Sequence, residues 1–223
     1  MQLYLVNGFD RNNRLERGEL EMSNIGILAY GSLICDPAEE IQAVITDCIE
    51  SVKTPFKVEF LRSSESRDGA PALVPVEEGS DYGDYVKAKI LVLKEDISEK
   101  EATDMLYRRE IHKVGRSNKY DPPPKPGPND VLICKYEYSR DLKIVLYTKI
   151  KGNIKNPIPK NLACLAIKSA CSKAGKQRRD GISYLYNAKC SDIKTPLMPE
   201  YEKEVLRKTN TKTLREAWVA LTT

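Results

Sequence analysis

One glutamate of this sequence is placed where a carboxylate can do acid–base chemistry. Glu110 ends a segment that we expect to be a helix, 98–110, and it follows Ala102 and Leu106 at one-turn intervals on the apolar stripe of that helix. A carboxylate at the end of such a stripe is partly desolvated, which raises its pKa toward neutrality and suits it to take up and return a proton. The alternative is a structural ion pair with one of three arginines: Arg62, Arg108 or Arg109.

A sharp turn after a buried strand is the second candidate. The nearly continuous apolar run 25–30 is typical of a central strand, and it stops at Gly31 and Ser32. Gly31 permits unusual backbone dihedrals and the close approach of a ligand. Consecutive backbone N–H groups in such a turn form a concavity that suits a carboxylate or an oxyanion. We therefore expect Tyr30, Gly31, Ser32 and Leu33 to bind substrate, the alternative being a plain strand-ending turn.

Two nucleophile arrangements are weaker alternatives. The nucleophile elbow of esterases has the pattern G-x-S-x-G, whereas Ser32 lies in A-Y-G-S-L. Cys35 is close in sequence and His112 is the only histidine, but nothing around Cys35 indicates an activated thiol. We therefore expect neither a serine triad nor a Cys35–His112 pair.

Charge and hydropathy exclude other classes of function. The 223 residues include 36 basic and 32 acidic side chains, and a net charge of +4 is too small to predict nucleic-acid binding. We interpret one basic cluster as a solvated face, with a nucleic-acid or protein adaptor as the alternative: Lys173, Lys176, Arg178 and Arg179. No run approaches the roughly 18 apolar residues of a membrane helix, and residues 1–24 lack the apolar core of a signal peptide.

The cysteines and the single histidine predict neither a metal site nor a cofactor. The six cysteines are scattered, and none forms a C-x-x-C pair: Cys35, Cys48, Cys134, Cys164, Cys171 and Cys190. A zinc site is therefore not expected, and the thiols of a chain this long are better explained as reduced. We expect a cytoplasmic protein with no metal, no cofactor, no membrane association and no nucleic-acid partner.

The elements that must position these residues predict an α+β domain. Six segments have the pattern of strands: 25–30, 56–60, 71–75, 86–93, 131–138 and 142–150. Five have the pattern of helices: 38–51, 98–110, 162–173, 201–206 and 214–221. Capping boxes, Ser98 with Glu101 and Thr213 with Glu216, mark two of the helix starts. Periodicity leaves open whether the sheet closes into a small barrel.

Five short motifs occur in an order and at a spacing that resemble a known family. They are I-L-A-Y-G-S-L at 27–33, P-A-L-V-P at 71–75, M-L-Y-R-R-E at 105–110, I-V-L-Y at 144–147 and G-I-S-Y-L at 181–185. Together they are similar to the γ-glutamylcyclotransferase-like families, including the AIG2-like and ChaC-type proteins. Departures are Tyr107 in place of the family's aspartate, Ile111 in place of a frequent glycine, and a proline-rich insertion at 121–129.

The resemblance implies a fold and a domain organisation. It implies a small mixed β-barrel with flanking helices at 25–190, preceded by an appendage at 1–24 and followed by a C-terminal helical extension at 191–223. It also implies that the substrate is a small γ-glutamyl compound. The oligomeric state stays open.

The resemblance also implies a reaction. The α-amine of a γ-glutamyl amide or amine attacks its own γ-carbonyl, which yields 5-oxoproline and a free amine or amino acid. Glu110 would be the acid/base, the N–H groups of Gly31, Ser32 and Leu33 would hold the α-carboxylate or the oxyanion, and Tyr147 would close the pocket. Two alternatives stay open: other γ-glutamyl chemistry in the same fold, and a non-catalytic module that binds a small acidic ligand.

Overall fold

The computed structural model describes residues 25–223, so the predicted appendage at 1–24 lies outside the described residues. The strands are β1 (Ile25–Ala29), β2 (Ile45–Ser64), β3 (Ala70–Pro75), β4 (Asp84–Leu93), β5 (Leu132–Tyr136) and β6 (Ile144–Lys149). The helices are α1 (Glu39–Gln42), α2 (Glu99–Glu110), α3 (Pro159–Ala170), α4 (Lys173–Lys176), α5 (Gly181–Cys190), α6 (Met198–Thr209) and α7 (Leu214–Thr222). Two 3₁₀ turns are η1 (Gly31–Ile34) and η2 (Glu65–Arg67). The α+β class is therefore confirmed.

The strands form one mixed sheet in the order β3-β2-β4-β1-β6-β5. β1 lies inside the sheet, antiparallel to β4 and parallel to β6, with Ile27 opposite Leu91 on one side and Leu146 on the other. All five residues of β1 are buried, which confirms the prediction of a central strand. A strand held on both sides gives the turn that follows it a fixed starting position.

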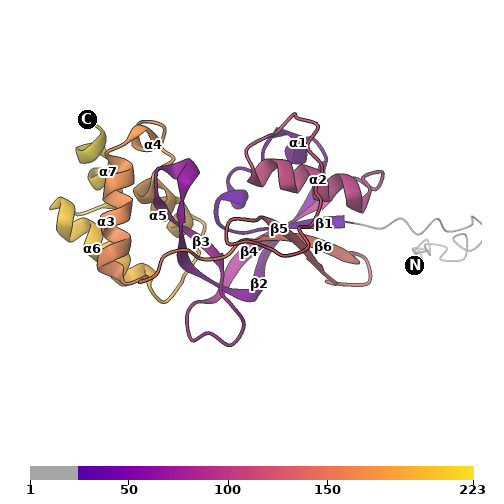
Figure 1. Cartoon of the computed structure of the whole chain (residues 1–223), viewed down its shortest axis with the longest axis horizontal. Helices are drawn as coiled ribbons and strands as arrows, with labels where there is room; N and C mark the ends of the chain where they lie inside the picture. The colour runs from indigo at the N-terminus through magenta and orange to yellow at the C-terminus, as the bar shows by residue number, and fades with distance from the viewer. Residues whose placement is uncertain (1–24) are drawn as a thin grey trace, which may run out of the picture.

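The predicted barrel is wrong for the described residues, because the sheet stays open between its edge strands β3 and β5. Helices α3 and α5 pack beside β3 (Figure 1). The nearest approach to closure is made by a loop. The Asn153 N–H donates to the Leu61 carbonyl of β2 (3.0 Å), and the Asn153 Oδ1 accepts the Ser63 N–H (2.7 Å).

The two faces of the sheet bury different helices. On one face, Ile27 and Ala29 of β1 pack with Ala102 and Leu106 of α2. On the other face, residues such as Phe60 continue into a core shared with helices α3, α5, α6 and α7, which gather beside β3 and away from α1 and α2 (Figure 1). Helices α6 and α7, which belong to the predicted extension 191–223, pack on α3 and α5.

A buried carboxylate joins the sheet to these C-terminal helices. Glu59 of β2 is fully buried, and its oxygens accept hydrogen bonds from the Thr195 hydroxyl (2.6 Å) and the Leu197 N–H (3.1 Å) just before α6. The Phe60 N–H donates to the same carboxylate (2.8 Å). Burial nonetheless raises the pKa of Glu59, because removal from water penalises its charged form.

The helix predicted at 38–51 is wrong, because only α1 is helical there and β2 begins at Ile45. The register of β2 against β4 shifts between Ile45 and Asp47 and again between Ile49 and Val52. Each shift inserts an extra residue and breaks the two-residue alternation of a strand. The apolar positions are then spaced as they are on a helix, which accounts for the error.

The helix α2 is confirmed together with its capping box. The Glu101 N–H donates to the Ser98 hydroxyl (3.2 Å), and the Glu101 carboxylate accepts the Ser98 N–H (3.0 Å). The sequence did not predict α5, which Asp180 caps by accepting the N–H groups of Ile182 and Ser183. Within residues 25–223, no helix has the length and apolar character to cross a bilayer.

Candidate active site

Glu110 ends α2 and is partly shielded from water. Ala102 and Leu106 are fully buried, as the predicted apolar stripe requires, and the side chain of Glu110 is 22% exposed. One guanidinium nitrogen of Arg109 donates to the Glu110 carboxylate at 2.6 Å. The ion pair that the sequence offered as a structural alternative is thus present, with Arg109 as the partner.

Arg109 also joins Glu110 to the turn after β1. Its second terminal nitrogen donates to the Ser32 hydroxyl (3.2 Å) and to the Asp36 carbonyl (2.8 Å), and its Nε donates to the same carbonyl (3.2 Å). One planar side chain therefore binds the end of α2 and both ends of the η1 turn. The structure places Glu110 and Ser32 on a common guanidinium, although 77 positions separate Ser32 from Arg109.

The backbone of the η1 turn has the shape that requires glycine. Gly31 has a φ of +58°, and a Cβ built on it would lie 2.7 Å from the hydroxyl oxygen of Tyr184. The Leu33 N–H donates to the Tyr30 carbonyl (3.3 Å), so of the three predicted N–H groups only those of Gly31 and Ser32 are candidates for a ligand. The Leu33 side chain is buried in the α2 core.

The side chain of Tyr30 points into the sheet core. Its hydroxyl donates to the Thr148 carbonyl of β6 (2.8 Å), and the residue is 9% exposed. Burial raises the pKa of Tyr30, and the nearby Glu110 carboxylate raises it further. Tyr30 therefore fixes the turn against β6 as a neutral phenol and contributes its backbone to the site.

Two further arginines lie close to Tyr184 and His112, beside the Arg109–Glu110 pair. The Arg67 guanidinium lies 4.9 Å from the centre of the Tyr184 ring and donates to the Arg179 carbonyl (3.2 Å). Burial lowers the pKa of Arg67, and the charges of Arg179 and Arg109 add to that effect. Burial likewise lowers the pKa of His112, followed by the effect of Arg179, while Glu110 opposes the shift. The site therefore has an excess of positive charge that suits an anionic ligand.

Tyr184 completes this group. Its oxygen accepts the Leu73 N–H (3.3 Å), which leaves its own hydrogen for donation to a ligand beside Gly31. Burial raises the pKa of Tyr184, so the phenol stays protonated. The sequence-based interpretation did not assign Tyr184, Arg67 or Arg109 to the site, although Tyr184 lies in the G-I-S-Y-L motif that it quoted.

Tyr147 is the predicted site residue that does not join this group directly. It lies on β6 beyond the Phe56 ring, whose centre is 4.7 Å from that of Tyr147 and 5.5 Å from that of Tyr30. Tyr147 lines a cavity of about 590 Å³, of which Glu110 and Ser32 are not lining residues. Its predicted role in the same pocket stays a prediction.

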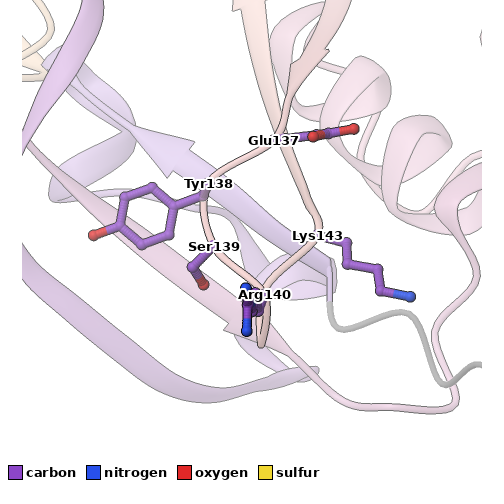
Figure 2. Close-up of a pocket in the computed structure, with 5 residues that line it drawn as sticks. All are labelled: Glu137, Tyr138, Ser139, Arg140 and Lys143. Carbon is purple, nitrogen blue, oxygen red and sulfur yellow. The ribbon is translucent and has the colours of Figure 1, made fainter.

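A second hollow, of about 610 Å³, lies at the β5–β6 hairpin. All five of its lining residues come from that one turn (Figure 2), and Tyr138 points to the opposite side from Glu137 and Lys143. The hollow is formed by a single surface loop, and none of the predicted site residues lines it.

The alternative chemistries find little support in the geometry. The Cys35 thiol is exposed, and it lies 3.7 Å from the Ser191 hydroxyl. In the basic cluster, the Arg178 guanidinium lies 4.5 Å from the centre of the Trp218 ring. In the region that the structure describes, no three His, Cys, Asp or Glu side chains gather as metal ligands would.

Comparison with known proteins does not identify the chain. A scan against protein-family models finds no matching family, and a search of the curated proteins finds no match. The assignment of a function therefore depends on the motifs of the sequence and on the geometry around Glu110.

Proposed function

We propose that this protein is a γ-glutamylcyclotransferase-type enzyme that converts a γ-glutamyl amide or amine into 5-oxoproline and a free amine or amino acid. The observation that carries the proposal is the pair of hydrogen bonds from Arg109 to Glu110 and Ser32. They hold a carboxylate beside a glycine turn and under an excess of positive charge. A zwitterionic glutamyl group needs these three features, namely a base, N–H donors and a partner for its carboxylate.

The α-carboxylate of the substrate would lie among the cations. Arg67 is half-buried, and within residues 25–223 the structure gives it no ion pair, so its guanidinium favours an anionic ligand. The N–H groups of Gly31 and Ser32 and the hydroxyl of Tyr184 would add hydrogen bonds on the other side. The glutamyl chain would then be bent so that its amine approaches its own γ-carbonyl, which by itself accelerates the reaction by several orders of magnitude.

Glu110 would move the proton. It accepts a proton from the α-ammonium, and the freed amine forms a bond to the γ-carbon. The γ-carbon then releases the leaving nitrogen, to which Glu110 returns the proton. The second proton that the attacking nitrogen loses passes to the released amine, which leaves as an ammonium. One carboxylate acting in turn as base and acid contributes about 10²–10⁴-fold. We place the enzyme in the cytoplasm, since its six cysteines are all unpaired, as thiols of a reducing compartment are.

The test is 5-oxoproline release from γ-glutamyl amino acids, glutathione and γ-glutamylamines by the wild type, Glu110→Gln and Glu40→Gln. Glu40 is a matched control, because it pairs with the neighbouring Arg108 and is 21% exposed, against 22% for Glu110. We expect Glu110→Gln to lose at least about 10²-fold of turnover while Glu40→Gln keeps it. Full activity of Glu110→Gln would overturn the role of Glu110, and tight γ-glutamyl binding with no release by the wild type would favour the binding module.

A further inference from the structure

The cavity next to Tyr147 has the size and lining of a ligand site that the proposed reaction does not use. Its volume of about 590 Å³ is within the range of small-molecule pockets. It opens between β2, β6 and the loop 76–83, and four aromatic side chains line it: Phe56, Tyr85, Tyr136 and Tyr147. The site residues Glu110, Arg109 and Ser32 do not line this cavity.

The aromatic wall is preformed. The Tyr147 ring packs against Phe56 at 4.7 Å and against Tyr136 at 6.1 Å between ring centres. Burial raises the pKa of Tyr136 to about 12, and burial followed by the nearby Cys134 thiol raises that of Tyr147. Both phenols are therefore neutral at physiological pH and present an apolar ring with a polar end. Such a wall takes an aromatic ring edge-on or offset.

The loop over the cavity is held in place. The Lys57 ammonium donates to the Ser80 carbonyl at 3.4 Å. At the far end of the loop, Gly83 has a φ of +76°, and a Cβ there would lie 2.8 Å from the Val58 carbonyl oxygen. The loop therefore follows β2 closely and keeps its acidic side chains at the cavity.

Charges of both signs line the cavity without ion pairs. Within residues 25–223, the structure gives no ion pair to Lys149 of β6 or to the loop acids Glu77, Glu78 and Asp81, all of which line the cavity. A ligand that carries both an ammonium and a carboxylate would be complementary to this pattern, and its ammonium would also be attracted by the aromatic faces.

We propose that this cavity binds an α-amino acid with an aromatic side chain, its ring on Phe56 and Tyr147, its ammonium facing the loop acids and its carboxylate facing Lys149. Two sources can supply this chemistry. One is a free amino acid. The other is the amino acid that the γ-glutamyl substrate carries, which alone depends on the proposed function. Until the γ-glutamyl bond breaks, the nitrogen of that amino acid is an uncharged amide, so the cavity would hold its ring and carboxylate first and its ammonium after release. Leu73, which contacts the Gly31 position, precedes the cavity-lining Pro75 by two residues, roughly 7 Å along β3.

Calorimetric titration of the full chain tests binding directly. L-Phenylalanine should bind, whereas phenethylamine and 3-phenylpropionate, which each lack one charge, should bind at least tenfold more weakly. Lys149→Gln should weaken the binding of phenylalanine about tenfold and leave the binding of phenethylamine unchanged. Lys151→Gln, an exposed lysine two residues further on, should change neither. Absence of phenylalanine binding at millimolar concentration, or equal effects of the two lysine variants, would overturn the proposal.

A second set of measurements identifies the source. Competitive inhibition of 5-oxoproline release by free L-phenylalanine, with a raised KM for γ-glutamylphenylalanine but not γ-glutamylglycine in Lys149→Gln, assigns the cavity to the leaving end. Non-competitive inhibition assigns it to a free amino acid. Phenylalanine binding by Glu110→Gln should equal that of the wild type, so a failure of the proposed reaction leaves this result standing.

Discussion

The hydroxyl oxygen of Tyr184 lies 2.7 Å from where a Cβ on Gly31 would stand. The same glycine has a φ of +58°, which other residues adopt only at a cost. Two independent constraints therefore require glycine at the turn beside Glu110. Tyr184 is the side chain nearest to that Cβ position and comes from α5, far along the chain.

Gly31→Ala should destabilise the protein by about 3 kcal/mol and abolish activity, because the methyl group displaces Tyr184 in addition to straining the backbone. Urea unfolding and 5-oxoproline release measure the two effects. Gly115→Ala is the matched control, because Gly115 also has a positive φ, +74°, lies outside both cavities, and has no atom of residues 25–223 within 4 Å of its Cβ position. It should lose about 1 kcal/mol and keep its activity. Equal losses in the two variants would contradict the role of Tyr184.

Arg109→Lys should lower kcat by about 10²-fold with a small change in stability, because an ammonium cannot contact Glu110 and Ser32 together as the planar guanidinium does. Steady-state kinetics with the best substrate of the panel checks this. Arg108→Lys is the control, since Arg108 pairs with Glu40 and the Asn118 carbonyl. Similar kcat values for the two variants would show that Arg109 only stabilises the fold.

The buried Glu59 predicts a definite pH dependence of stability. Its pKa in the folded protein is above the ordinary value of 4.5, so the unfolded chain releases this proton first as the pH rises. Stability from this group is therefore fully present below about pH 4.5 and is lost as the pH rises toward the folded pKa.

Glu59→Gln removes this titration, so the wild type should lose stability relative to the variant from pH 4.5 upward. The difference in the free energy of unfolding between the two proteins, measured in urea at several pH values, gives the sign. The variant should be less stable overall, because an amide cannot accept the bonds from Thr195, Leu197 and Phe60 together. A wild type that gains stability relative to the variant over this range would contradict the prediction.

Hydrogen bonds from Arg62 hold the proline-rich loop 121–129 in place. Its guanidinium donates to the Pro128 carbonyl (3.2 Å), the Asn129 side chain (3.1 Å) and the Lys151 carbonyl (2.8 Å). Arg62→Ala should lose about 1 kcal/mol and speed amide hydrogen exchange in 121–129. Arg116→Ala, an exposed arginine in the preceding loop, should do neither. Unchanged exchange in Arg62→Ala would mean that the prolines alone hold the loop.

Local patterns in the sequence predicted the elements that carry Glu110 and Gly31. The capping box and the apolar stripe of α2 are properties of a few neighbouring residues, and so is the buried run of β1. Such patterns can be read from one segment without its partners. The prediction for 38–51 was wrong because the start of β2 is bulged. Its irregular spacing of apolar residues can be interpreted only together with its pairing to β4.

Contacts between segments that are distant in the chain could not be predicted from the sequence. Arg109 is sequence neighbour to Glu110, yet its link to Ser32 depends on how α2 meets η1. Arg67 and Tyr184 meet because η2 and α5 pack at the same place, and no periodicity marks either residue. Whether the sheet closes likewise depends on how β3 and β5 lie relative to each other, which the pattern of a single segment does not reveal.

The parallel pairing of β1 with β6 has a consequence for folding. Ile25 lies opposite Ile144, so the central strand cannot complete its place in the sheet until two thirds of the chain has been synthesised. The hydrogen bonds that Glu59 accepts form later still, because Thr195 and Leu197 must be synthesised first. Such long-range contacts make folding slow, and a nascent chain would expose the apolar strand β1 meanwhile. We therefore expect the Glu110 site to form only after α5, which carries Tyr184, has emerged from the ribosome.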